Sequence, residues 1–165
     1  MKNLVVLFFC VIFGSQVSFA HDANMFTSYI YKKDNRLLMK LSMAHDGIHS
    51  ATKKSLRKSD IGKLGDENYD QKILNYLKNS IEVYDGPRRA AVNVGKYSFG
   101  SHQSDVYFEL TGLRKNVTKL QVVLKLGSEN PHHTNLLRVI DPKTNLVSGK
   151  YFLRAHNEWR QEVSF

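Results

Sequence analysis

Apolar side chains recur at every second position along most of the chain, and this alternation limits the possible folds more than any other feature. Successive side chains of a β-strand point to opposite faces of a sheet, so a period of two predicts strands that each bury one face. The alternating stretches cover residues 25–31, 37–43, 81–83, 90–94, 106–110, 120–126, 136–140, 146–153 and 159–165. The chain is therefore predicted to be mainly β.

Turn-forming residues separate these stretches at short intervals. Residues 33–36 divide the first two stretches into a hairpin, and Asp85, Gly86, Asp141 and Pro142 mark later turns. Strands of this spacing are typical of two antiparallel sheets packed face to face with Greek-key connections. We expect an antiparallel β-sandwich, immunoglobulin-like in kind, with about nine strands.

A helical insertion is predicted at about residues 46–79, directly after the first hairpin. Asp46 is expected to cap a first helix, and Tyr69, Ile73, Tyr76 and Leu77 have the i, i+4, i+7, i+8 spacing of a second. The alternative fold is an open α+β sheet with both helices packed on one face. The narrow apolar stripe of the second helix favours the sandwich.

The first 20 residues have the layout of a secretory signal peptide. Lys2 precedes an apolar run at residues 4–13, and Ser18 and Ala20 place small side chains at the two positions that signal peptidase reads. The apolar run is too short to span a bilayer, which needs about 20 residues. We expect cleavage after Ala20, a single domain at residues 21–165 without a transmembrane segment, and a periplasmic or secreted location.

Removal of this segment would leave 145 of the 165 residues and no cysteine, because the only cysteine is Cys10. Disulfides and thiol nucleophiles are then excluded, and the core must hold the domain together. The chain also lacks a G-x-S-x-G elbow, a G-x-G-x-x-G loop and a P-loop. These features favour a noncatalytic binding or accessory module, whose ligand the sequence does not identify.

Copper binding is the alternative function. Cleavage would make His21 the N-terminal residue, whose amine and imidazole can together bind Cu(II), with a second imidazole completing the site. The second ligand could come from any of the other histidines, His45, His49, His102, His132, His133 and His156. His132 and His133 are adjacent in a predicted loop, so the predicted metal ligands are His21, His132 and His133.

The chain carries 24 Lys and Arg against 15 Asp and Glu, a formal charge of +9. The densest group of cations is Lys53, Lys54, Arg57 and Lys58, which is predicted to contact an anionic partner such as lipid head groups or an acidic polysaccharide. Export argues against nucleic acid, and so does the lack of aromatic side chains among these four residues.

The order of these parts resembles a family of short exported bacterial β-rich proteins of unknown function. The resemblance rests on His21 after the signal, the hairpin at residues 25–43, and the Tyr76-Leu77 pair that ends a helix before the strand of Ile81 and Val83. It implies an exported β-rich domain and supplies no catalytic residues.

Overall fold

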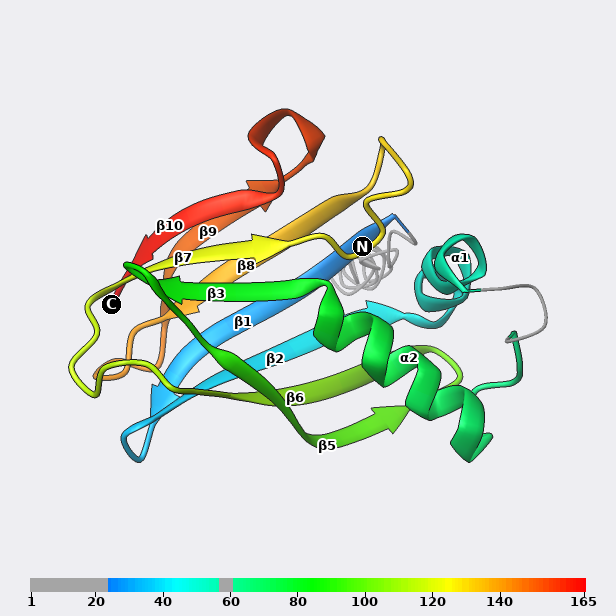
Figure 1. Ribbon diagram of the computed structural model, residues 1–165, viewed down its shortest axis with the longest axis horizontal. Helices are drawn as coiled ribbons and strands as arrows, with labels where there is room; N and C mark the ends of the chain where they lie inside the picture. The colour runs from blue at the N-terminus through cyan, green and yellow to red at the C-terminus, as the bar shows by residue number, and fades with distance from the viewer. Residues whose placement is uncertain (1–23, 57–60) are drawn as a thin grey trace, which may run out of the picture.

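The structure is a computed structural model that describes residues 24–56 and 61–165, and these form two α-helices and ten strands (Figure 1). The predicted signal peptide at residues 1–20, His21, Arg57 and Lys58 lie outside the described residues. The helices are α1 (His45–Ser55) and α2 (Glu67–Asn79). The strands are β1 (Met25–Lys33), β2 (Arg36–Ala44), β3 (Ile81–Asp85), β4 (Arg88–Arg89), β5 (Ala91–Phe99), β6 (Gln103–Thr111), β7 (Lys119–Leu124), β8 (Thr134–Ile140), β9 (Val147–Leu153) and β10 (Arg160–Ser164).

The strands form two sheets that pack as layers. One sheet has six strands in the order β5-β6-β2-β1-β8-β9, and the other has four in the order β10-β7-β3-β4. The prediction of a mainly β chain with two sheets and two helices after the first hairpin is confirmed. The described residues contain ten strands rather than about nine, and the strand with no alternating stretch in the sequence is β4, which has two residues.

The sheets are not purely antiparallel, which corrects the sequence-based prediction. β1 and β8 pair in parallel, with Met25 beside Thr134 and Ile30 beside Val139. Parallel neighbours cannot be joined by a tight hairpin. The connection between β1 and β8 is therefore long, and it passes through strands of both sheets. Alternation of side chains shows which residues face the core but carries no information about the direction of the neighbouring strand.

The first hairpin has the turn that its residues predict. Asp34 and Asn35 adopt positive φ angles of 50° and 59° between the antiparallel β1 and β2. Asn and Asp tolerate this left-handed conformation better than other residues with a side chain, and a two-residue turn of this kind matches the twist of the strands. The turn therefore fixes the register in which β1 meets β2.

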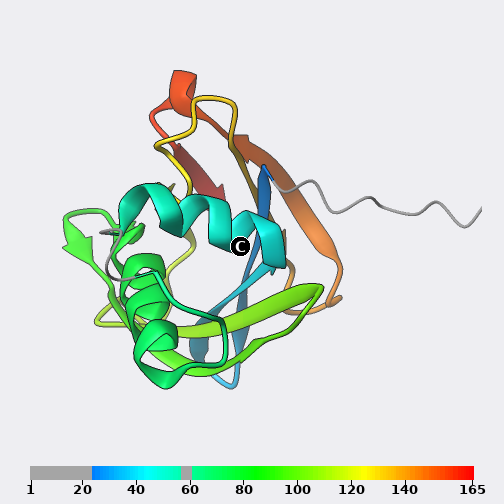
Figure 2. The same cartoon turned by 90° about the vertical axis from the view of Figure 1, so that its right-hand side faces the viewer.

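The core lies between the six-stranded sheet and a second layer formed by the four-stranded sheet and α2 (Figures 1 and 2). The largest fully buried side chains come from both layers, including Phe26, Phe108, Met39, Ile73 and Leu120. α2 buries Ile73, Leu74 and Leu77 along one face. A narrow apolar stripe is enough here because α2 covers only the part of the six-stranded sheet that the four-stranded sheet leaves open.

The two helices begin differently. The side chain of Asp66 caps α2 by accepting a 3.1 Å hydrogen bond from the backbone N–H of Tyr69. α1 begins at His45 after Ala44, with no side-chain cap, so the prediction that Asp46 caps this helix is wrong. Asp46 lies in the first turn, where its charge favours the helix dipole. Neither described helix is long and apolar enough to cross a membrane.

Candidate functional site

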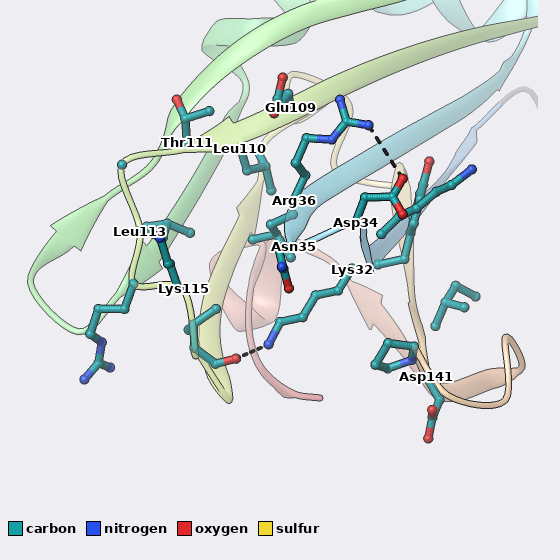
Figure 3. Close-up of a pocket in the computed structure, with 18 of the residues that line it drawn as sticks. Lys32, Asp34, Asn35, Arg36, Glu109, Leu110, Thr111, Leu113, Lys115 and Asp141 are labelled. Carbon is teal, nitrogen blue, oxygen red and sulfur yellow. Dashed lines mark hydrogen bonds and ion pairs between the residues drawn. The ribbon is translucent and has the colours of Figure 1, made fainter.

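An open basin of about 1000 Å³ lies at the end of the sandwich that carries the first hairpin (Figure 3). Three connections that are distant in sequence form its wall: the β1–β2 turn, the segment that joins β6 to β7, and the start of the segment that joins β8 to β9. Figure 1 shows all three at the end opposite the helices. The two-layer fold is what brings these connections together.

Lys32 crosses the basin from the inner face of β1. Its ammonium group donates a hydrogen bond to the backbone carbonyl of Val117, and Figure 3 shows the side chain extended toward this acceptor. The Nζ atom also lies 5.0 Å from the centre of the Phe165 ring, a cation–π distance. A lysine can occupy this inward-facing position because the sandwich is open here and its charge meets polar partners.

The basin wall carries more positive than negative charge. Its cations are Lys32, Lys33, Arg36, Arg114 and Lys115, against the carboxylates of Asp34, Glu109 and Asp141. Arg36 lies 3.9 Å from Asp34, and Arg114 pairs with the buried Asp85 behind the wall. Lys33 and Lys115 are exposed and form no ion pair with any described residue. Their charges are available to an anion in the basin.

Two carboxylates fix the shape of the surrounding segments. Hydrogen bonds that Arg114 donates, including one of 2.7 Å from its Nε to the carboxylate, hold the pKa of Asp85 below its usual value. Backbone N–H groups of Lys143 and Thr144 donate to Asp141 and lower the pKa of that carboxyl too. Both groups are therefore ionised at neutral pH, and they hold the β6–β7 and β8–β9 connections in place around the basin.

Of the predicted histidine ligands, the structure describes His132 and His133, which lie at the other end of the six-stranded sheet and differ in exposure. His132 is exposed, whereas His133 is only 3% exposed, with its ring 4.5 Å from Phe26 and 6.4 Å from Trp159 between centres. The ring of His133 also packs against Gly127, where an added Cβ would lie 2.8 Å from it. His133 is thus a core residue, and His132 is the one of the two whose side chain reaches solvent.

The two described members of the predicted cation group, Lys53 and Lys54, lie away from the basin. Lys53 and Lys54 are exposed in the last turn of α1, which follows the C-terminal end of β2, while the basin lies at the N-terminal end of the same strand. The structure does not bring the two together. Sequence reasoning missed the basin because Lys33 and Arg36 read only as turn residues, and nothing local links them to Arg114 or Lys115.

No protein-family model matches the sequence, and no curated protein matches it. Within residues 24–56 and 61–165, no three His, Cys, Asp or Glu side chains are grouped closely enough to hold a metal ion. The geometry of the chain's own residues therefore carries the functional interpretation.

Proposed function

We propose that the protein is an exported, noncatalytic binding module that holds an anionic ligand in the basin at the hairpin end of the sandwich. The observation that carries this proposal is the pair of unpaired cations, Lys33 and Lys115, on the wall of an open hollow of about 1000 Å³. A hollow of this size falls at the upper end of the range of small-molecule sites. Its charged wall favours a ligand with carboxylate or phosphate groups.

Export supports the same function, because an accessory module outside the cytoplasm meets acidic saccharides and organic acids. The export proposal rests on the signal-like residues 1–20 and on the absence of cysteine from the remaining 145 residues. The immunoglobulin-like topology also stays a proposal. Two packed layers support it, and the parallel β1–β8 pair is the feature that argues against it.

A titration of the chain at residues 21–165 with citrate and with trigalacturonate, followed by backbone NMR, tests the basin. We expect shifts confined to the β1–β2 turn and to residues 111–117, and weaker binding as salt is added, because exposed charges are screened. Lys33→Gln and Lys115→Gln should each weaken binding by about three- to fivefold, the scale of one exposed ion pair.

Lys78→Gln is the matched control, because Lys78 is an exposed cation on α2, away from the basin. It should bind like the parent protein. Shifts centred elsewhere, or equal losses in Lys78→Gln and Lys115→Gln, would contradict a site in the basin. Binding of the neutral maltotriose with the same affinity would contradict recognition by charge.

Copper binding by His21 is a second candidate, and one observation favours it. The chain enters β1 beside the histidine loop: the backbone carbonyl of Asn24 accepts from Thr134, and its side chain accepts from Asn130. His21 is three residues before Asn24, and three extended residues span at most about 11 Å. That reach includes the neighbourhood of the exposed His132.

Electron paramagnetic resonance of the same chain with one equivalent of Cu(II) tests this candidate. A nitrogen-ligated signal that is lost in His21→Ala and altered in His132→Ala is the expected result. His156→Ala, which removes an exposed histidine from η2 (Ala155–Asn157), is the control. An unchanged signal in His21→Ala would exclude the copper site, without bearing on the basin.

A further inference from the structure

The outer face of the six-stranded sheet carries a straight row of alternating rings and cations. Lys40 on β2 lies beside Tyr107 of β6 on one side and Tyr29 of β1 on the other. Tyr29 in turn lies beside Arg138 of β8, and Arg138 beside Lys150 of β9. These five residues occupy one cross-strand line because each pair is directly opposite in the register of its two strands.

Contacts between side chains extend and order this line. Lys96, at the irregular part of β5, places its ammonium group 4.6 Å from the centre of the Tyr107 ring, and Lys40 lies 5.6 Å from the same ring. The guanidinium of Arg138 lies 5.5 Å from the centre of the Tyr29 ring. We call Lys96, Tyr107, Lys40, Tyr29, Arg138 and Lys150 the ring-and-cation row. It crosses six strands, a length of about 24 Å at about 4.8 Å per strand.

No described segment covers this face. The four-stranded sheet and both helices lie on the opposite side of the six-stranded sheet, as the two ribbon views show together (Figures 1 and 2). The side chains of the row are half-buried or exposed, and the neighbouring Phe152 on β9 is 47% exposed. An apolar and cationic surface of this extent is unusual on a face that stays solvated.

The charge of the row is positive and largely uncompensated. Asp105 pairs with Lys40 at 2.9 Å, and Ser42 donates to the same carboxylate at 2.6 Å. Lys96, Arg138 and Lys150 form no ion pair with any described residue. Beyond the row, the carboxylates on this face are Asp105 and Glu109, both on β6, so the positive charge follows the row and not the whole face.

We infer that the ring-and-cation row binds a linear acidic polysaccharide that carries one carboxylate per disaccharide. Lys96, Lys40 and Arg138 lie on every second strand, so their spacing along the row is about 9–10 Å, the length of a disaccharide unit. A bilayer would need cations spread over a plane. The neighbouring outer-face positions of β1, β2 and β6 are instead Thr27, Ser42 and Asp105 on one side of the row and Tyr31, Leu38 and Glu109 on the other.

The rings themselves argue for a polyanion that is not a single-stranded nucleic acid. Base stacking needs aromatic faces that are open to the ligand. Here Tyr107 already has Lys40 and Lys96 over its ring, and Tyr29 has Arg138. The rings instead hold the cations at fixed positions along the line, which reduces the entropy lost when a regularly charged chain binds. This site is separate from the basin, and either proposal can fail without the other.

Isothermal titration of residues 21–165 with hyaluronan oligosaccharides tests the inference. We expect binding that weakens as salt is added. Lys96→Gln and Arg138→Gln should each reduce the affinity by about three- to fivefold. Lys78→Gln on α2 removes the same charge away from the row and should leave the affinity unchanged. Backbone NMR spectra of each variant verify that the fold is intact, and neutral dextran should not bind.

Several results would overturn the inference. One is the absence of hyaluronan binding at low salt, and another is an equal loss of affinity in Lys78→Gln and Lys96→Gln. Tighter binding of oligothymidylate than of hyaluronan, sensitive to Arg138→Gln, would assign the row to single-stranded nucleic acid. Binding to phosphatidylglycerol vesicles with the same sensitivity, and none to hyaluronan, would assign it to a membrane surface.

Discussion

The contact between Asp85 and Arg114 shows how a single pair of residues shapes the candidate site. The side chain of Asp85 is 1% exposed, yet its charge is balanced by a guanidinium that is mostly in solvent. Arg114 also donates its backbone N–H to Asp85. The pair therefore anchors the β6–β7 connection, and with it Lys115, to the end of β3.

Asp85→Asn should reduce stability in a way that depends on pH. Because Arg114 holds the pKa of Asp85 below its usual value, the ionised carboxylate stabilises the fold above the unfolded-state pKa of about 4. This stabilisation is lost as the pH falls through the folded-state pKa. Urea unfolding should show a clear loss of stability in the variant at pH 7, and the difference from the parent should shrink progressively as the pH is lowered below about 4.

Asp34→Asn is the control for this prediction. Asp34 is exposed and its nearest cation, Arg36, lies 3.9 Å away, so its replacement should have little effect at either pH. If Asp85→Asn and Asp34→Asn shifted the urea midpoint equally, the anchoring role of the Asp85–Arg114 pair would be refuted.

At the scale of elements, the two helices differ in how far their own residues account for their formation. α2 has its cap, its acidic first turn and its apolar stripe in the sequence, and it forms where the pattern indicates. α1 lacks a side-chain cap and depends on contacts across the fold. The hydroxyl groups of Thr52 and Tyr69, 3.2 Å apart and buried, join it to α2.

Removal of the acidic side chain at the start of each helix should destabilise the protein to different extents. Asp66→Ala removes the cap of α2 and should lower the free energy of unfolding by about 1 kcal/mol. Asp46→Ala removes only a charge in the first turn of α1 and should cost less than about 0.5 kcal/mol. Chemical denaturation of both variants at neutral pH measures the difference. A larger loss in Asp46→Ala would show that Asp46 caps α1 in solution.

On the scale of the whole molecule, the six-stranded sheet has a protected centre and exposed edges. β1 and β2 have neighbours on both sides, whereas β5 and β9 are edge strands with mostly exposed side chains. β4 is a two-residue edge of the smaller sheet. Edge strands open more readily because fewer hydrogen bonds and buried contacts must break.

The rate of hydrogen exchange at each backbone amide should therefore depend on the position of its strand in the sheet and not on its position in the chain. The central amides of β1 and β2 should exchange slowest, through global unfolding, and those of β9 and β4 fastest. Exchange in β9 as slow as in β2 would contradict this order, and would indicate that the β9 edge is covered in solution.

The sequence alone was sufficient to predict the longer strands, the helix at α2 and the first hairpin, and its alternation separates the residues that the structure buries, such as Phe26 and Phe108, from their more exposed neighbours. These features follow from interactions a few residues apart: the alternation of side chains, the capping side chain and the turn geometry of Asp34 and Asn35. Two sheets were also predictable, because so many half-apolar strands can bury their faces only against one another.

Only the tertiary structure decided which strands are neighbours. The parallel pairing of β1 with β8 places Asn24 beside the histidine loop and Tyr29 beside Arg138. The same strand order brings Lys33 and Lys115 to one basin and aligns six side chains in the ring-and-cation row. Both candidate sites combine residues from distant strands, and local periodicity cannot encode such proximity because it fixes the face of a side chain without fixing its neighbour.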